Sequence, residues 1–237
     1  MRFVLSAAFY VLISFVLPVQ AQTVVDVELV LAVDISYSMD LEEQRLQRDG
    51  YVAALLDPDV HKAIAAGPNG RIAVTYFEWA GQFVQRMIVP WTLIDGPETA
   101  KQFVEQLQKT PPSRDRMTSI TGAMEYSAKQ FEQSPFRGLR RVIDVSGDGP
   151  NNSGGLVTIM RDRLVAAGVV INGLPIMVKV SSVNNQFDVA HLDEYFVDCV
   201  IGGPGAFMIP IKAKDEFLPA TRRKLLLEIA GIEPPAR

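Results

Sequence analysis

Apolar and polar positions along the chain predict strands interleaved with helices. Short unbroken apolar runs, such as residues 29–33, are typical of strands that are buried on both faces of a sheet. Longer mixed segments that follow a capping or helix-starting residue predict helices. Strands are therefore expected at 27–33, 71–77, 83–89, 141–146, 169–178 and 206–211, and helices at 41–56, 98–109, 119–133, 153–167, 191–201 and 215–230.

The order of these segments predicts an α/β fold. Strands that alternate with helices form a mostly parallel central sheet with helices on both faces. The exception is the short connection at Ala80-Gly81, which predicts one antiparallel hairpin at an edge of the sheet. No internal repeat or long linker divides the chain, so a single domain is expected after the N-terminal segment.

The first 21 residues have the pattern of a secretory signal peptide. Arg2 provides a positive charge, residues 3–17 are mostly apolar, and Pro18 ends the run. Small residues before the end of the segment at Ala21 predict cleavage there, which leaves residues 22–237 as the mature domain. An uncleaved anchor is the alternative, but the apolar run is shorter than the roughly 20 residues of a membrane-spanning helix. Export from the cytoplasm is expected.

Composition excludes several classes of function. Lys and Arg number 23 and Asp and Glu 27, for a net charge of −4, so the chain lacks the basic surface of a nucleic-acid-binding protein. One cysteine and two histidines argue against a zinc cluster and against a Cys-His enzyme. Cys199 is expected to be a small buried residue.

The candidate chemistry lies where the first strand meets the first helix. Asp34, Ser36 and Ser38 follow the apolar run, at a position where α/β folds bind their ligands. Asp40 and Glu43 predict a capping box for the next helix, so the two serines are not needed as caps. An acid and two hydroxyls that converge on one loop suit a hard divalent cation.

Two later residues extend this pattern to a family resemblance. Thr118 precedes a predicted helix, and Asp148 follows a predicted strand in the pair Asp148-Gly149. The order D-x-S-x-S, then T, then D-G resembles the metal-ion-dependent adhesion site of von Willebrand factor A-type domains. Transferred residue by residue, the metal ligands are Asp34, Ser36, Ser38, Thr118 and Asp148. The threonine usually follows a glycine in that family and here follows Met117; Ser119 is the alternative ligand.

The resemblance covers roughly residues 24–231 and carries specific expectations. It implies a Rossmann-like three-layer sandwich that holds Mg²⁺, or Mn²⁺ or Ca²⁺, at the carboxyl edge of the sheet. It also implies a binding module rather than an enzyme, with a protein partner whose Asp or Glu completes the coordination of the ion. The likeness is to exported, stand-alone bacterial members, which points to a periplasmic or secreted protein.

Two other interpretations remain open. Residues 147–152 resemble the magnesium loop of haloacid dehalogenase-type phosphatases, which also place a nucleophilic aspartate after the first strand. Those enzymes need a second acid where this chain has Ser36, which cannot act as a general acid near neutral pH. The final acid of their magnesium loop is also replaced here, by Asn152. The other alternative is a domain of the same fold whose ion site is degenerate, with the polar residues serving as turns and caps.

Overall fold

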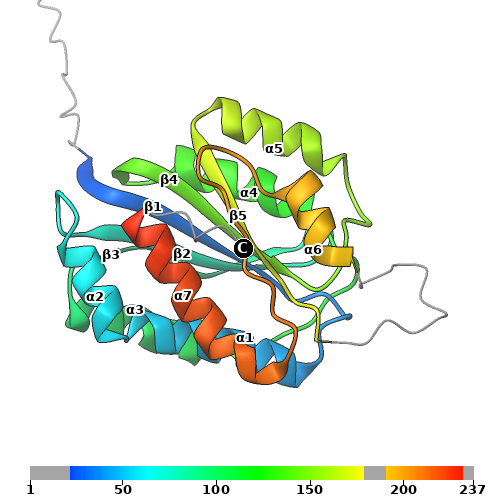
Figure 1. Cartoon of the computed structure of the whole chain (residues 1–237), viewed down its shortest axis with the longest axis horizontal. Coiled ribbons are helices and arrows are strands. Elements are labelled where there is room, and N and C mark those ends of the chain that lie inside the picture. Colours follow the sequence, from blue (N-terminus) through cyan, green and yellow to red (C-terminus); the bar gives the residue numbers. More distant parts are fainter. Residues whose placement is uncertain (1–21, 179–190, 232–237) are drawn as a thin grey trace, which may run out of the picture.

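A five-stranded sheet with the order β3-β2-β1-β4-β5 forms the centre of the protein (Figure 1). The computed structural model describes residues 22–178 and 191–231, so the predicted signal peptide lies outside the described residues. The strands are β1 (Thr23–Asp34), β2 (Ile72–Trp79), β3 (Gln85–Ile94), β4 (Phe136–Gly147) and β5 (Val169–Pro175). All neighbouring strands are parallel except β2 and β3, which form the expected antiparallel edge hairpin.

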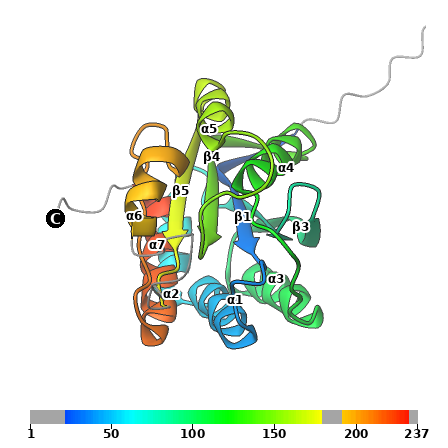
Figure 2. The same cartoon turned by 90° about the vertical axis from the view of Figure 1, so that its right-hand side faces the viewer.

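Helices cover both faces of the sheet, as Figure 2 shows end-on. One layer contains α1 (Leu41–Leu55), α2 (Pro58–Ala65), α3 (Pro97–Lys109) and α7 (Phe217–Ala230), which follows a 3₁₀ turn at Lys214–Glu216. The other contains α4 (Ile120–Glu132), α5 (Val157–Ala166), the short α6 (Leu192–Tyr195) and a π-helical turn, η2 (Phe196–Val200). The three-layer α/β architecture expected from the sequence is confirmed.

The central strand β1 explains why its apolar run has no polar interruption. Leu29, Leu31 and Val33 pack in the core beneath α1, α3 and α7. Val30 and Ala32 point to the opposite face and pack with α4 and α5. Because side chains alternate between the faces of a strand and both faces are covered, every position here must be apolar.

Helix α2 was not expected from the sequence. Asp57 caps it through a hydrogen bond from the backbone N–H of Asp59 to its side chain (2.8 Å), and Pro58 occupies the first turn. Proline is well tolerated there because the first N–H groups of a helix have no partner within the helix. The Asp-Pro pair was the sequence signal for this helix.

The expected sixth strand at 206–211 was wrong. In this segment only isolated bridges occur, from Met208 to Gly173 and from Ile211 to Ile176. Pro210 interrupts the segment, and a proline cannot donate to a strand ladder.

Two helix predictions were only partly right. The helix expected at 153–167 begins at Val157, and the helix expected at 191–201 changes from an α-helical turn to a π-helical turn at Phe196. Cys199, expected to be buried, is only half-buried and packs at the margin of the second core.

The parallel strands bring the candidate site together. β1 ends at Asp34 and β4 ends at Gly147, one residue before Asp148, so both acids lie at the carboxyl edge that faces the viewer in Figure 2. Within residues 22–178 and 191–231, no helix is both long and apolar enough to cross a membrane.

Candidate metal site

Four of the five predicted ligands form a continuous chain of hydrogen bonds. The backbone N–H of Ser36 donates to Asp34 Oδ1 (2.6 Å), and the hydroxyls of Ser36 and Ser38 lie 2.8 Å apart. Ser38 Oγ in turn donates to Asp148 Oδ1 (2.5 Å), which links the β1–α1 loop to the end of β4. The two acids and two hydroxyls therefore converge from strands that are distant in sequence.

The loop can present these hydroxyls because another residue caps the following helix. The side chain of Asp40 accepts hydrogen bonds from the backbone N–H groups of Glu42 and Glu43, both at 2.8 Å. Glu43 completes the capping box by accepting from the backbone N–H of Asp40 (2.8 Å). This local arrangement was expected from the sequence, and it leaves Ser36 and Ser38 at the edge of the sheet.

Thr118 and Ser119 have different surroundings. Ser119 Oγ caps α4 by accepting from the N–H of Gly122 (3.1 Å), and it donates to the carbonyl of Ser153 (2.8 Å). Thr118 is held by its backbone, because Asn152 Oδ1 accepts from its N–H (2.8 Å) and the N–H of Asn152 donates to its carbonyl (2.8 Å). In the described part of the chain, no hydrogen bond engages the hydroxyl of Thr118. The geometry therefore favours Thr118 over Ser119 as a ligand.

Backbone contacts hold the Thr118 loop against the β1–α1 loop. The N–H of Asp115 donates to the carbonyl of Ile35 (3.0 Å), and Ser36 and Asp115 form a parallel bridge. Arg114 donates to the carbonyl of Tyr37 and stacks on its ring. All five predicted ligands thus belong to segments that meet at one edge.

The burial of Asp34 is the principal electrostatic feature of the site. Its side chain is fully buried. Burial is the larger cause and the nearby charge of Asp148 the smaller cause that raise the pKa of Asp34 to about 8. The hydrogen bond from Ser36 acts in the opposite direction. Asp34 Oδ2 has no hydrogen-bond partner, and no Lys or Arg forms an ion pair with Asp34 in the part of the chain that the structure describes.

Gly147 leaves room beside the unpartnered oxygen. A Cβ atom at this position would lie 3.0 Å from Asp34 Oδ2 and 3.5 Å from the ring of Trp79. In the sequence, Gly147 stands out only as part of the phosphatase-like segment 147–152. Its spatial role depends on the pairing of β4 with β1, so sequence spacing alone did not show it.

These residues fit a hard divalent cation. The donors are carboxylate and hydroxyl oxygens, which Mg²⁺, Mn²⁺ and Ca²⁺ prefer, and one buried carboxylate oxygen receives no hydrogen bond from the residues that the structure describes. Among the described residues no group of three or more His, Cys, Asp or Glu forms a metal cluster. A site here would therefore depend on its hydroxyls.

Met117 adopts a backbone conformation that favours glycine. Its φ is 69°, in the left-handed region, and it is the sole non-glycine residue with positive φ in the part of the chain described. Glycine usually precedes the threonine in the family that the chain resembles, and this geometry gives a physical reason. An L-residue in this conformation is strained, and such strain concentrates at functional sites.

The comparisons with known proteins agree with the fold. Proximal thread matrix protein 1 from the mussel byssus, with a zinc-occupied MIDAS motif, superposes with a TM-score of 0.64 and 15% identity, covering 88% of this chain and 49% of that one. BatB from Bacteroides thetaiotaomicron gives a TM-score of 0.55 and 20% identity, covering 86% and 99%. The open pilus adhesin SpaC from Lactobacillus rhamnosus GG gives 0.62 and 11%, covering 88% and 30%. This chain thus spans about half of the mussel protein and less of the adhesin.

A von Willebrand factor type A structure from Catenulispora acidiphila superposes with a TM-score of 0.55 and 13% identity, covering 86% of this chain and 43% of that one. The architecture is that of a von Willebrand factor A-type fold, as the sequence resemblance implied. A family model described as "Protein of unknown function (DUF1194)" matches residues 24–233, and the chain belongs to this family. No curated protein matches the sequence.

Proposed function

We propose that this domain binds a protein partner through a divalent cation held by Asp34, Ser36, Ser38, Thr118 and Asp148. The observation that carries the proposal is the buried, unpartnered oxygen of Asp34, which lies where the predicted ligands converge. A buried carboxylate without a compensating charge is unfavourable, and a cation would remove that cost. The MIDAS motif named for the mussel protein and the adhesin function named for SpaC support the same class of module.

The bound ion would act as the attachment point for a carboxylate of the partner. Two acids and three neutral hydroxyls provide five oxygens, which leaves the coordination of a six-coordinate ion incomplete, so an external Asp or Glu is the natural further ligand. Asp34 would bind the ion directly or through water, and Ser38 would orient Asp148 as well as bind. This function is non-enzymatic, and it belongs to an exported protein in the periplasm or outside the cell.

Calorimetric titration of residues 22–237 with Mg²⁺, Mn²⁺ and Ca²⁺ tests the metal. We expect one ion per chain, no binding by Asp34→Ala, and unchanged binding by the control Asp162→Asn, an exposed acid on α5. Wild-type protein that binds none of the three ions, even with acetate present, would identify the site as degenerate. Normal binding by Asp34→Ala would place the ion elsewhere.

A second assay separates the module from a phosphatase. Ser36 cannot protonate a leaving group, and the side chain of Asn152 is already engaged by the backbone of Thr118. We therefore expect no Mg²⁺-dependent hydrolysis of p-nitrophenyl phosphate. Robust hydrolysis that Asp34→Asn abolishes would replace the binding function with the enzymatic one.

A further inference from the structure

Four exposed apolar side chains lie on loops around the candidate ion site. Tyr37, Phe83, Met117 and Leu156 are exposed by 54, 89, 53 and 70%. They come from the β1–α1, β2–β3, α3–α4 and β4–α5 connections respectively, all at the carboxyl edge of the sheet. Single exposed apolar residues are normal, but several on one face mark an interaction site. We call these four residues the apolar rim.

Contacts between the loops show that the rim surrounds one place. The N–H of Ser119 donates to the carbonyl of Ala80 (2.7 Å), which joins the Met117 loop to the turn that carries Phe83. Ser119 Oγ bonds to Ser153, which joins the same loop to the one that carries Leu156. The bond from Ser38 to Asp148 joins the Tyr37 loop to the end of β4. The four loops therefore form one connected surface with the ion ligands among them.

Arginines give this surface a positive charge beside the apolar groups. Arg114 and Arg116 are exposed on the Met117 loop, and Arg114 lies 5.2 Å from the centroid of the Tyr37 ring. Arg86, exposed at the start of β3, donates to Ser113 Oγ of the same loop (2.5 Å). Together with a bound cation, these arginines favour an acidic partner.

We infer that the apolar rim recognises a protein segment in which the ion-binding Asp or Glu is flanked by large apolar side chains. The inference rests on the proposed function, because the ion would position the segment. Flanking apolar groups that pack on the rim would exclude water from the metal–carboxylate contact, and electrostatic contacts are stronger where water is excluded. The rim would thereby supply selectivity among acidic segments that the ion alone cannot provide.

An array of acetylated, amidated hexapeptides with a central Asp or Glu and varied neighbours tests this directly. In Mg²⁺ we expect the labelled domain to prefer peptides with aromatic or aliphatic neighbours, and to lose all binding in EDTA. The double variant Phe83→Ser/Leu156→Ser should weaken the preferred peptides at least about tenfold in fluorescence polarisation, as loss of central interface anchors does. Its Mg²⁺ affinity should remain that of the wild type.

The control is Leu139→Ser, an exposed leucine (59%) on β4 away from the carboxyl edge, which should change nothing. If peptides with apolar and with serine neighbours bind equally in Mg²⁺, the rim has no such role while the proposed function stands. If no acidic peptide binds although Mg²⁺ does, both the role of the rim and the proposed binding of a partner carboxylate are wrong.

Two other occupants of the rim would also overturn the inference. Rim-dependent binding to phosphatidylserine vesicles without Mg²⁺ would identify a membrane surface. A concentration-dependent dimer that the double variant converts to a monomer, measured by analytical ultracentrifugation, would identify a second copy of the chain.

Discussion

Two buried acids, Asp34 and Asp144, differ in whether a cation from the described part of the chain pairs with them. Asp34 and Asp148 lie at the carboxyl edge of the sheet, where the oxygen Asp34 Oδ2 has no partner. Asp144 of β4 and Glu228 of α7 lie between the sheet and the helix, and the ammonium group of Lys224 contacts both. Among the described residues, Lys224 forms ion pairs with Asp144 and Glu228, whereas no Lys or Arg forms one with Asp34.

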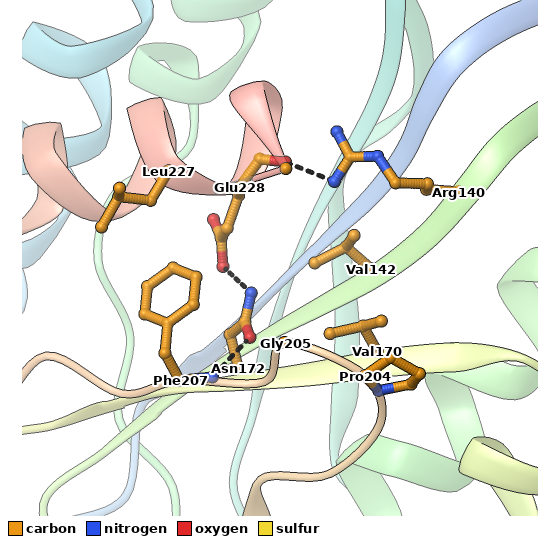
Figure 3. A pocket seen from close by; sticks show the side chains of 10 residues that line it. Arg140, Val142, Val170, Asn172, Pro204, Gly205, Phe207, Leu227 and Glu228 are labelled. Carbon is orange, nitrogen blue, oxygen red and sulfur yellow. Dashed lines mark hydrogen bonds between the residues drawn. The ribbon is translucent and has the colours of Figure 1, made fainter. Parts of the chain in front are cut away.

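The second pair is held within regular elements and further hydrogen bonds. Lys224 Nζ lies 2.6 Å from Asp144 Oδ1, and Tyr51 donates its hydroxyl to Asp144 Oδ2 (3.1 Å). Asn172 donates to Glu228 Oε1 (3.0 Å), and Arg140 donates to the carbonyl of Glu228 (2.9 Å), as Figure 3 shows. The internal cation makes Asp144 and Glu228 part of the architecture, whereas Asp34, which has no such cation among the described residues, fits the external ion that we propose.

The largest expected effect comes from removing the internal cation. Lys224→Met should lower the free energy of unfolding by about 3–5 kcal/mol, because it leaves two buried acids without a counter-charge. Urea denaturation measures the loss, and Mg²⁺ should not restore it. Lys62→Met, which removes an exposed ion pair with Asp59, is the control and should have little effect. A small effect of Lys224→Met would mean that Asp144 and Glu228 do not depend on Lys224 for their stability in the folded protein.

The next largest effect is the dependence of the protein's stability on pH through the protonation of Asp34. The pKa of Asp34 is 3.8 in the unfolded chain and about 8 in the folded protein. Between these pH values the folded state therefore holds a proton on Asp34 that the unfolded state has lost. The stability of metal-free protein should therefore fall as pH rises from about 4 to 8, by at most about 1.4 kcal/mol per pH unit for this group. Asp34→Asn should flatten the slope, measured by denaturation in EDTA.

Glu228 contributes in the same direction but over a lower range. Its pKa is raised to about 7, by burial above all and against the effect of Lys224. The slope between pH 7 and 8 should therefore belong mainly to Asp34 and persist in Glu228→Gln. If Glu228→Gln removes that slope while Asp34→Asn leaves it, the pH dependence of stability in this range comes from Glu228 and not from Asp34.

A smaller effect separates a structural hydroxyl from a candidate ligand within the proposed ion site. Ser119→Ala should cost about 1 kcal/mol in EDTA, because it removes the N-cap of α4. Thr118→Val should leave that stability nearly unchanged but lower Mg²⁺ affinity, and Thr118→Ser should retain the affinity. Calorimetry that finds Mg²⁺ binding intact in Thr118→Val and lost in Ser119→Ala would assign the ligand to Ser119.

The smallest effect tests the backbone strain beside the ion site. Met117→Gly should stabilise metal-free protein by up to about 1 kcal/mol, because relief of the left-handed conformation exceeds the entropy cost of glycine only slightly. Thermal unfolding in EDTA measures the change. A clear loss of stability would show that contacts of the Met117 side chain outweigh its strain.

Local sequence was sufficient to predict the parts of the fold that depend on interactions between neighbouring residues. The apolar run before Asp34, the capping box of Asp40 and Glu43, and the hairpin at Ala80-Gly81 each depend on neighbouring residues, and the structure contains all three. The same reasoning failed at residues 206–211, where a proline outweighed the apolar pattern. It also missed α2, although Asp57-Pro58 is a local signal.

What the sequence determined by itself is that Asp34 and Asp148 stand at the carboxyl ends of two strands, because parallel strands order their carboxyl ends along one edge. Only the tertiary structure distinguished Thr118 from Ser119, since the cap of α4 and the bond to Ser153 engage one hydroxyl and not the other. It also placed Lys224 between Asp144 and Glu228, which are far apart in the chain. Whether a buried acid has a counter-charge depends on packing across the sheet, and that packing is not encoded in any local pattern of residues.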